Sequence, residues 1–199
     1  ILLELSKMNP QGLIFDIGSL KTPLRDGLNA LLKENCLVTS IHPMFGPGTE
    51  LLSGKHLIYV DVGNKVATEK AKDLFSATMV KKLDMDIDDH DRLIAYVLGL
   101  SHALNIAFFT ALADSGESAP KLAKLSSTTF DAQLIVSEAV ASDSTELYFE
   151  IQKLNEYGLA PLNALCASAN QIRKVIQDNN KDGFIELMEK GKQYLATRN

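Results

Sequence analysis

The periodicity of apolar residues changes once along this chain, near residue 84. Up to that point, segments with helical period alternate with short apolar runs, which lie at residues 12–19, 37–41, 55–62 and 79–83. Near-continuous apolar strands that alternate with helices are typical of an α/β sheet covered on both faces. Beyond residue 84 every segment has helical period. We therefore predict an α/β domain with a parallel sheet over residues 1–84, followed by an all-helical domain over residues 85–199.

Helix start and stop signals place the helices at residues 1–8, 24–32, 66–78, 84–113, 122–141 and 144–157, with one more from Pro161 and a last one around Phe184. The first of these begins at Ile1 in an apolar segment without an N-cap. We therefore expect the given sequence to begin inside a longer protein.

The composition argues against several classes of partner. The net charge is −5 and the sequence pI is about 5.4, which does not fit a nucleic-acid-binding footprint. No uninterrupted apolar run approaches the ~18 residues of a membrane span, so we expect no membrane partner. Cys36 and Cys166 lie far apart in apolar surroundings. We interpret them as buried thiols of a reducing, cytoplasmic protein, with neither a disulfide nor a metal site.

A histidine stands where one predicted strand ends. The run at residues 37–41 is followed by His42-Pro43 and then by the turn Gly46-Pro47-Gly48. Proline biases the backbone of the preceding residue toward extended conformations, so His42 is held by backbone geometry. Because histidine titrates near neutral pH, His42 is a candidate proton-handling group. The alternative is that His42-Pro43 only begins a loop.

Polar residues also follow the neighbouring strand, in the segment Gly18-Ser19-Leu20-Lys21. Ligands of open parallel sheets bind outside the carboxyl ends of the strands. Neighbouring strand ends would bring Ser19 close to His42, so that its hydroxyl orients the imidazole while Lys21 offers positive charge to an anionic ligand. The alternatives are that Ser19 is only a turn residue and that Lys21 is only a solvated surface lysine.

The long helix over residues 84–113 carries polar residues in an apolar setting. At helical spacing, one face holds His90, Ile94, Val97, Ser101 and Asn105. Buried polar groups need hydrogen-bond partners, so a ligand or a neighbouring helix must satisfy the polar members of this face. The chain has no G-x-S-x-G nucleophile elbow and no G-x-G-x-x-G phosphate loop, and its His-Asp pair at residues 90–91 matches no metal motif.

Together these residues resemble the prephenate/arogenate dehydrogenase family of tyrosine biosynthesis. The matching motifs, in the family's order, are FDIGSLK (15–21), IHPMFGPG (41–48), DDHDRLIAYVLGLSHALNIA (88–107) and STELYFEIQKLN (144–155). The resemblance implies an NAD(P)-binding Rossmann domain followed by a helical dimerisation domain, and thus a homodimer. It also implies that the glycine-rich half of the Rossmann domain lies upstream, so we expect this chain alone to be inactive.

The resemblance implies oxidative decarboxylation of prephenate or arogenate, with hydride transfer to NAD or NADP. His42 would take the proton of the ring hydroxyl, with Ser19 orienting it and Lys21 helping to hold the site. Among the remaining positions, Gly18, Ser19 and Pro43 would bind the cofactor, and Ser101, His102 and Asn105 the substrate.

The chain departs from the family at the residues that grip the ring carboxylate. An arginine common in the family is replaced by Ala139, a second one near Asp131 is missing, and a histidine is replaced by Asn105. Arg25, Arg92 and Arg173 are the candidates to replace the missing carboxylate-binding arginine. Two alternative functions follow: a non-catalytic binding or regulatory module of the same fold, or a related two-domain dehydrogenase with another hydroxy-acid substrate.

Overall fold

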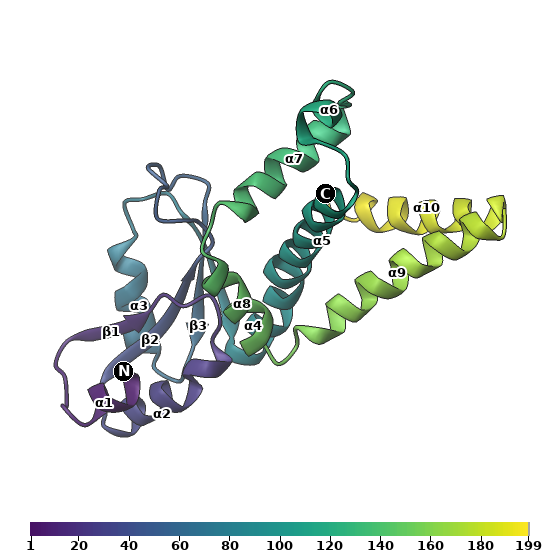
Figure 1. Ribbon diagram of the computed structural model, residues 1–199. Coiled ribbons are helices and arrows are strands. Elements are labelled where there is room, and N and C mark those ends of the chain that lie inside the picture. The colour runs from purple at the N-terminus through teal and green to yellow at the C-terminus, as the bar shows by residue number, and fades with distance from the viewer. Residues whose placement is uncertain (199) are drawn as a thin grey trace. The chain divides into compact units, whose positions relative to one another are not determined.

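The computed structural model describes residues 1–198. The chain forms two compact units, Ile1–Gly158 and a second one that begins at Leu159. The sheet and the first eight helices belong to the first unit, and α9 and α10 make up the second (Figure 1). The division at residues 84/85 that the sequence indicates stays a prediction.

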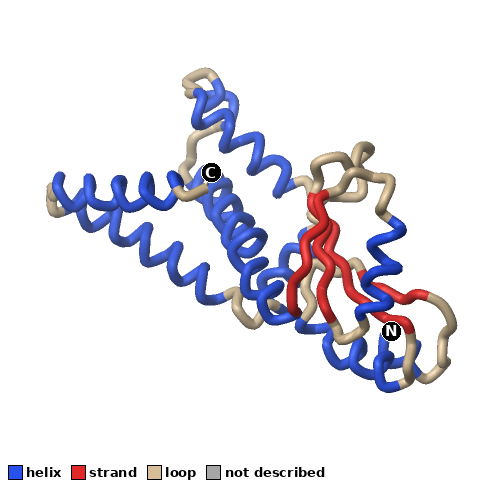
Figure 2. Tube along the Cα trace, turned by 180° about the vertical axis from the view of Figure 1, so that it is seen from behind, coloured by secondary structure: helices blue, strands red, loops and turns tan. Residues whose placement is uncertain are grey.

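Four strands form one sheet in the order β1 (Leu13–Asp16), β2 (Leu37–Pro43), β3 (His56–Asp61) and β4 (Lys81–Asp86). Figure 2 draws the strands in red. β1 and β2 are parallel, as are β3 and β4, but β2 and β3 are antiparallel. The prediction of a parallel sheet is therefore wrong at the centre. The connection over residues 44–55 contains no helix. Because a parallel return needs a crossover segment, usually a helix, β3 comes back antiparallel.

Side chains of the strands alternate between two covered faces, as the near-continuous apolar runs predicted. Leu57 and Tyr59 of β3 pack in one core with α3 (Lys65–Leu74). Ile58 and Val60 pack in another core with Ile94 of α4 (Ile87–Ile94). The α/β layer predicted for the first part of the chain is confirmed.

The face that α4 covers also receives the helices before β2. Leu28 and Leu31 of α2 (Arg25–Lys33) form a core with Val38 of β2, and α1 (Leu2–Ser6) packs beside α2. Since β2 residues two apart share a face, His42 points to the same side as Val38, toward α4. A short 3-10 turn, η1 (Thr22–Leu24), leads into α2.

One continuous helix runs from Ile87 to Asp114 and consists of α4, the π-helical segment η2 (Ala95–Leu100) and α5 (Ser101–Asp114). Its start is capped by Asp86, whose side chain accepts a hydrogen bond from the backbone N–H of Asp89. After it come α6 (Ala119–Ala123), α7 (Thr128–Ala141) and α8 (Thr145–Leu154). The helix predicted at residues 122–141 is in fact two, because Ser127 caps a new start.

The second unit is a helical hairpin of α9 (Leu159–Gln177) and α10 (Lys181–Ala196) (Figure 1). The side chain of Asn180 accepts a hydrogen bond from the N–H of Gly183 and so caps α10. Several large apolar side chains of the hairpin are exposed, among them Ile176, Phe184 and Met188.

We expected no membrane span, but the helix Ile87–Asp114 is long and apolar enough to cross a membrane by length and composition alone. Core helices pass the same test. Its polar residues His90, Asp91 and Asn105 are buried within the first unit and hydrogen-bonded there. The absence of a membrane partner stays a prediction.

The two cysteines differ in their surroundings. Both are free thiols; Cys36 is buried in the core beneath α2, but Cys166 on α9 is exposed. The prediction that both are buried is therefore wrong for Cys166, because its apolar neighbours in sequence do not cover it within the hairpin. The cytoplasmic location stays a prediction.

Candidate active site

A cavity of about 780 Å³ opens at the carboxyl ends of β1 and β2. Its walls come from the loop after β1, the end of β2 with the following turn, η2, α5, Asp143 and α8, all within the first unit. Of the residues predicted for the site, it brings together Gly18, Ser19, His42, Pro43 and His102. The two parallel strand ends therefore meet at one edge, as the sequence indicated.

His42 lies in the wall of this cavity and is only 3% exposed. Burial, together with His90 and the Lys21 ammonium nearby, lowers the pKa of His42 from 6.5 to about 3, although Asp91 acts in the opposite direction. The imidazole is therefore neutral at pH 7. A neutral imidazole has one nitrogen with a free lone pair and can accept a proton.

The partner that orients His42 is not Ser19. The Nδ1 atom of His42 lies 2.9 Å from Nε2 of His90, on α4. Ser19 lines the cavity, but Ser19 and His42 are not hydrogen-bonded to each other in residues 1–198. Sequence reasoning placed His90 on the polar face of the long helix and gave it no role. Its contact with His42 joins residues 48 positions apart.

Lys21 is fully buried and does not line the cavity. Its Nζ atom donates hydrogen bonds to Oδ1 of Asp16, at 2.6 Å, and to the carbonyl of Ile41, at 2.7 Å. Burial lowers the pKa of Lys21, and Asp16 opposes this shift. The lysine joins the ends of β1 and β2, and its charge is paired with Asp16. This placement does not fit the predicted contact with an anionic ligand.

On the long helix, His102 reaches the cavity, whereas Ser101 and Asn105 do not. Ser101 is exposed, and its hydroxyl donates to the carbonyl of Val97 at 2.7 Å. Asn105 is buried and accepts hydrogen bonds from Gln133 and Ser137 of α7. The π-helical segment η2 explains why His102 reaches the cavity in place of Ser101. A π turn holds an extra residue and rotates the following positions by about 100°.

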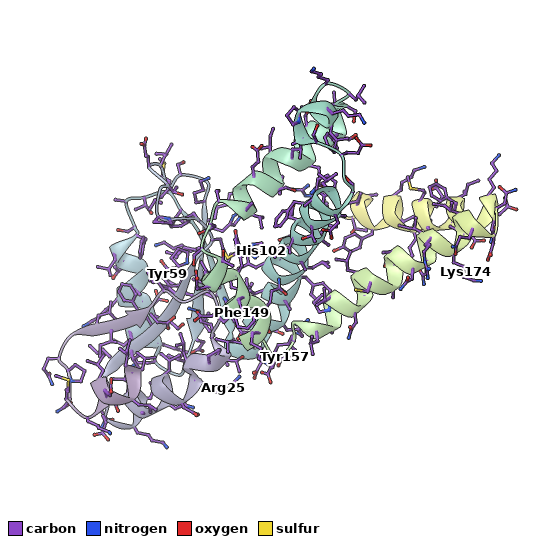
Figure 3. The ribbon with its side chains drawn as sticks, in the orientation of Figure 1. Arg25, Tyr59, His102, Phe149, Tyr157 and Lys174 are labelled. Atoms are coloured by element: carbon purple, nitrogen blue, oxygen red, sulfur yellow. The ribbon has the colours of Figure 1, made fainter. Side chains whose placement is uncertain are left out.

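His102, labelled in Figure 3, packs edge-on against the ring of Tyr148, with ring centroids 4.3 Å apart. Its Nδ1 atom is buried without a hydrogen-bond partner in residues 1–198. Burial lowers the pKa of His102, and Asp143 acts against this shift. Tyr148 and Asp143 also line the cavity and were not predicted as site residues. The motif at residues 144–155 was the only sequence signal near them.

Among residues 1–198, no arginine or lysine lines the cavity. Of the candidates to replace the missing arginine, Arg25 pairs with Asp88, and Arg92 pairs with Asp89. Both pairs lie near the start of α4 and are partly exposed. Ala139 is exposed on α7. Arg173 belongs to the second unit. The cavity wall formed by the first unit therefore contains one carboxylate, Asp143, and no cation.

A model of the prephenate dehydrogenase dimerization domain matches residues 86–190, just over half of the chain. A "Probable arogenate/prephenate dehydrogenase" of Methanocaldococcus jannaschii is 22% identical over 188 residues, which cover 93% of this chain and 42% of that protein. The T-protein of Enterobacter agglomerans is 22% identical over 197 residues, 98% of this chain and 52% of its own length. The chain thus spans about half the length of these relatives.

Two solved structures share the fold. Prephenate dehydrogenase from Aquifex aeolicus, in complex with hydroxyphenyl propionate and NAD⁺, superposes with a TM-score of 0.73 at 19% identity, covering 94% of this chain and 68% of that one. Synechocystis arogenate dehydrogenase gives a TM-score of 0.73 at 17% identity, covering 100% of this chain and 75% of that one. With the matched dimerization domain, these likenesses confirm the α/β-then-helical fold, and the chain belongs to the prephenate dehydrogenase family.

Proposed function

We propose that the whole protein is a prephenate or arogenate dehydrogenase, which oxidatively decarboxylates a cyclohexadienyl substrate with NAD or NADP in tyrosine biosynthesis. The observation that carries the proposal is a neutral, oriented His42 in the wall of a cavity at two parallel strand ends. The names of the relatives and the NAD⁺ complex of the Aquifex aeolicus enzyme support the same reaction class.

In this proposal His42 is the base. The substrate's ring hydroxyl donates its proton to Nε2 of His42 as the carbon that bears it is oxidised. Carbon dioxide leaves, and the ring becomes aromatic. His42 suits this role because it is neutral at pH 7 and lines the cavity.

The cofactor side of the cavity is formed by the loop after β1 and by Pro43. This wall consists of the apolar Ile17 and Pro43, of Gly18 and of one polar residue, Ser19, and such a surface fits a flat nicotinamide ring. NAD or NADP, when bound, supplies the acceptor for the hydride. Gly18, Ser19 and Pro43 would hold it here.

The substrate side is formed by α5 and α8. His102, with its unpartnered buried Nδ1, would hydrogen-bond the substrate, and Tyr148 would pack against its ring. Asp143 suits a substrate that carries an ammonium group, as the side chain of arogenate does.

We also propose that the protein is a homodimer through its helical part. The matched family model is a dimerization domain, and large apolar side chains are exposed on several helices, for example Ile135 at 68%, Phe149 at 66% and Ile176 at 64% (Phe149 is labelled in Figure 3). The family match carries this proposal, and these side chains would be available to a second copy of the chain. Sedimentation of the dilute whole protein as a folded monomer would contradict the dimer.

The test of the function is turnover by the whole protein. Purified protein is mixed with prephenate or arogenate and with NAD or NADP, and reduced nicotinamide is followed by absorbance. We expect turnover with at least one pair. Ligand binding in calorimetry without turnover would favour the non-catalytic module, and turnover only with another cyclohexadienyl or hydroxy acid would favour the related dehydrogenase.

A further inference from the structure

A chain of hydrogen-bonded side chains leads from the cavity into the protein interior. Nδ1 of His42 contacts Nε2 of His90 at 2.9 Å, and Nδ1 of His90 contacts Oδ1 of Asp91 at 2.7 Å. His90 and Asp91 are fully buried. These hydrogen bonds therefore link the imidazole of His42 in the cavity wall to the carboxylate of Asp91, which solvent does not reach.

Several donors hold the charge of Asp91. The backbone N–H of Lys21 donates to Oδ1 at 2.9 Å and to Oδ2 at 3.1 Å, and the N–H of Thr22 donates to Oδ2 at 2.7 Å. Burial alone would raise the pKa of Asp91, but the hydrogen bonds from His90, Thr22 and Lys21 outweigh it and lower the pKa to about 2. Asp91 is therefore a carboxylate at neutral pH.

The carboxylate determines where the protons of both rings lie. A carboxylate only accepts hydrogen bonds, so the proton of His90 is on Nδ1 and its Nε2 carries a lone pair. That lone pair accepts the Nδ1–H of His42. In neutral His42 the lone pair is then on Nε2, which has no protein hydrogen-bond partner in residues 1–198. This assignment follows from the network and places a free base on the cavity side.

The surroundings of His42 do not favour a positive charge on its ring. The Lys21 ammonium lies nearby, between Asp16 and the carbonyl of Ile41, the backbone neighbour of His42. Across the cavity stand His102 of α5 and Asp143, just before α8. Asp91, in contrast, touches His90 directly. A positive charge is therefore better placed on His90 than on His42.

We propose that His90 and Asp91 are positioning residues that fix the Nδ1–H tautomer of His42 and receive its Nδ1 proton when Nε2 takes up the proton of the substrate. In this step the substrate O–H bond and the Nδ1–H bond of His42 break, while an Nε2–H bond forms on His42 and another on His90. The charge thus ends on His90, beside the Asp91 carboxylate. The proposal rests on the proposed function, and it explains how a base that protonates poorly in isolation can work at neutral pH.

The tautomer is tested in the whole protein labelled with ¹⁵N-histidine. Long-range ¹H–¹⁵N spectra at neutral pH, with His42 assigned by the His42→Gln variant, show which nitrogen carries the proton. We expect Nδ1–H in the wild type and a mixture of tautomers in Asp91→Asn. A wild-type His42 protonated on Nε2 would overturn the proposal. This measurement needs no substrate, so it decides the proposal even if the whole protein shows no turnover, which would count against the proposed function alone.

The relay is tested by steady-state kinetics of Asp91→Asn and His90→Gln. We expect kcat to fall at least about ten-fold while KM changes less than about two-fold, as for orienting partners of a catalytic histidine. The Asp91 carboxylate stabilises a proton shared by His42 and His90. Loss of this carboxylate should therefore also move the acidic limb of the kcat/KM profile to lower pH. His90→Gln keeps polar contacts but cannot accept the proton, so it separates relay from folding if Asp91→Asn unfolds.

The matched control is Asp88→Asn, an exposed carboxylate on the same turn of α4 that pairs with Arg25. We expect its kcat and pH profile to equal those of the wild type, since exposed ion pairs contribute little. Circular dichroism confirms that each variant is folded. Wild-type kcat and an unmoved acidic limb in folded Asp91→Asn and His90→Gln would overturn the relay.

Discussion

Acid should destabilise this protein through His42. Its pKa is lowered from 6.5 to about 3 in the folded state. Below pH 6.5 the unfolded chain binds a proton at this residue, whereas the folded protein does so only near pH 3. The unfolded state therefore binds more protons across this window, and stability falls as the pH falls. From about pH 7 to about pH 4.5, one such group removes about 2–3 kcal/mol from the free energy of unfolding.

The assay compares urea unfolding of the wild type and of His42→Gln at both pH values. Glutamine does not titrate, so the variant should lose about 2–3 kcal/mol less on acidification, and titratable groups that do not contact residue 42 cancel between the two proteins. The pKa of Asp91 is lowered to about 2, so its stabilising contribution is present above its ordinary value of 3.8 and is lost only on further acidification. Equal losses in both proteins would refute the assignment of a buried, neutral His42.

Three further tests address the buried lysine, the phase of the long helix and the recognition of the substrate. Lys21→Met should destabilise the protein by about 3–5 kcal/mol because it leaves Asp16 without its buried partner. The double variant with Asp16→Asn should recover part of this loss. Equal stability of Lys21→Met and the wild type in urea would contradict the buried pair. Asn105→Ala should cost about 1–3 kcal/mol, whereas the exposed Ser101→Ala should change the free energy of unfolding by less than about 0.5 kcal/mol, and the reverse order would contradict the helix phase. Asp143→Asn should lower kcat/KM for arogenate relative to prephenate, and an unchanged ratio would remove Asp143 from substrate recognition.

The position of the site could be predicted from the sequence because it depends on local rules. Ser19 follows the apolar strand β1 and His42 stands near the end of β2, and parallel strands end at the same edge, so a cavity there was a reasonable expectation. The resemblance to the family added His102. These residues do meet around one cavity.

What could not be predicted depends on contacts between distant segments or on small changes in phase. The partner of His42 is His90, which the packing of α4 on the sheet brings to it. The burial of Lys21 depends on Asp16 and on the carbonyl of Ile41 at two strand ends. Ser101 turns away because η2 adds a residue to one turn, and apolar periodicity does not reveal such an insertion.

The central claim is that His42 accepts the proton of the substrate, and it is tested most directly by the turnover of His42→Asn in the whole protein. We expect kcat/KM with the preferred substrate to fall by about 10²–10⁴, the usual contribution of general acid–base catalysis, with an unchanged circular dichroism spectrum. A folded His42→Asn protein that retains wild-type kcat/KM would contradict the account.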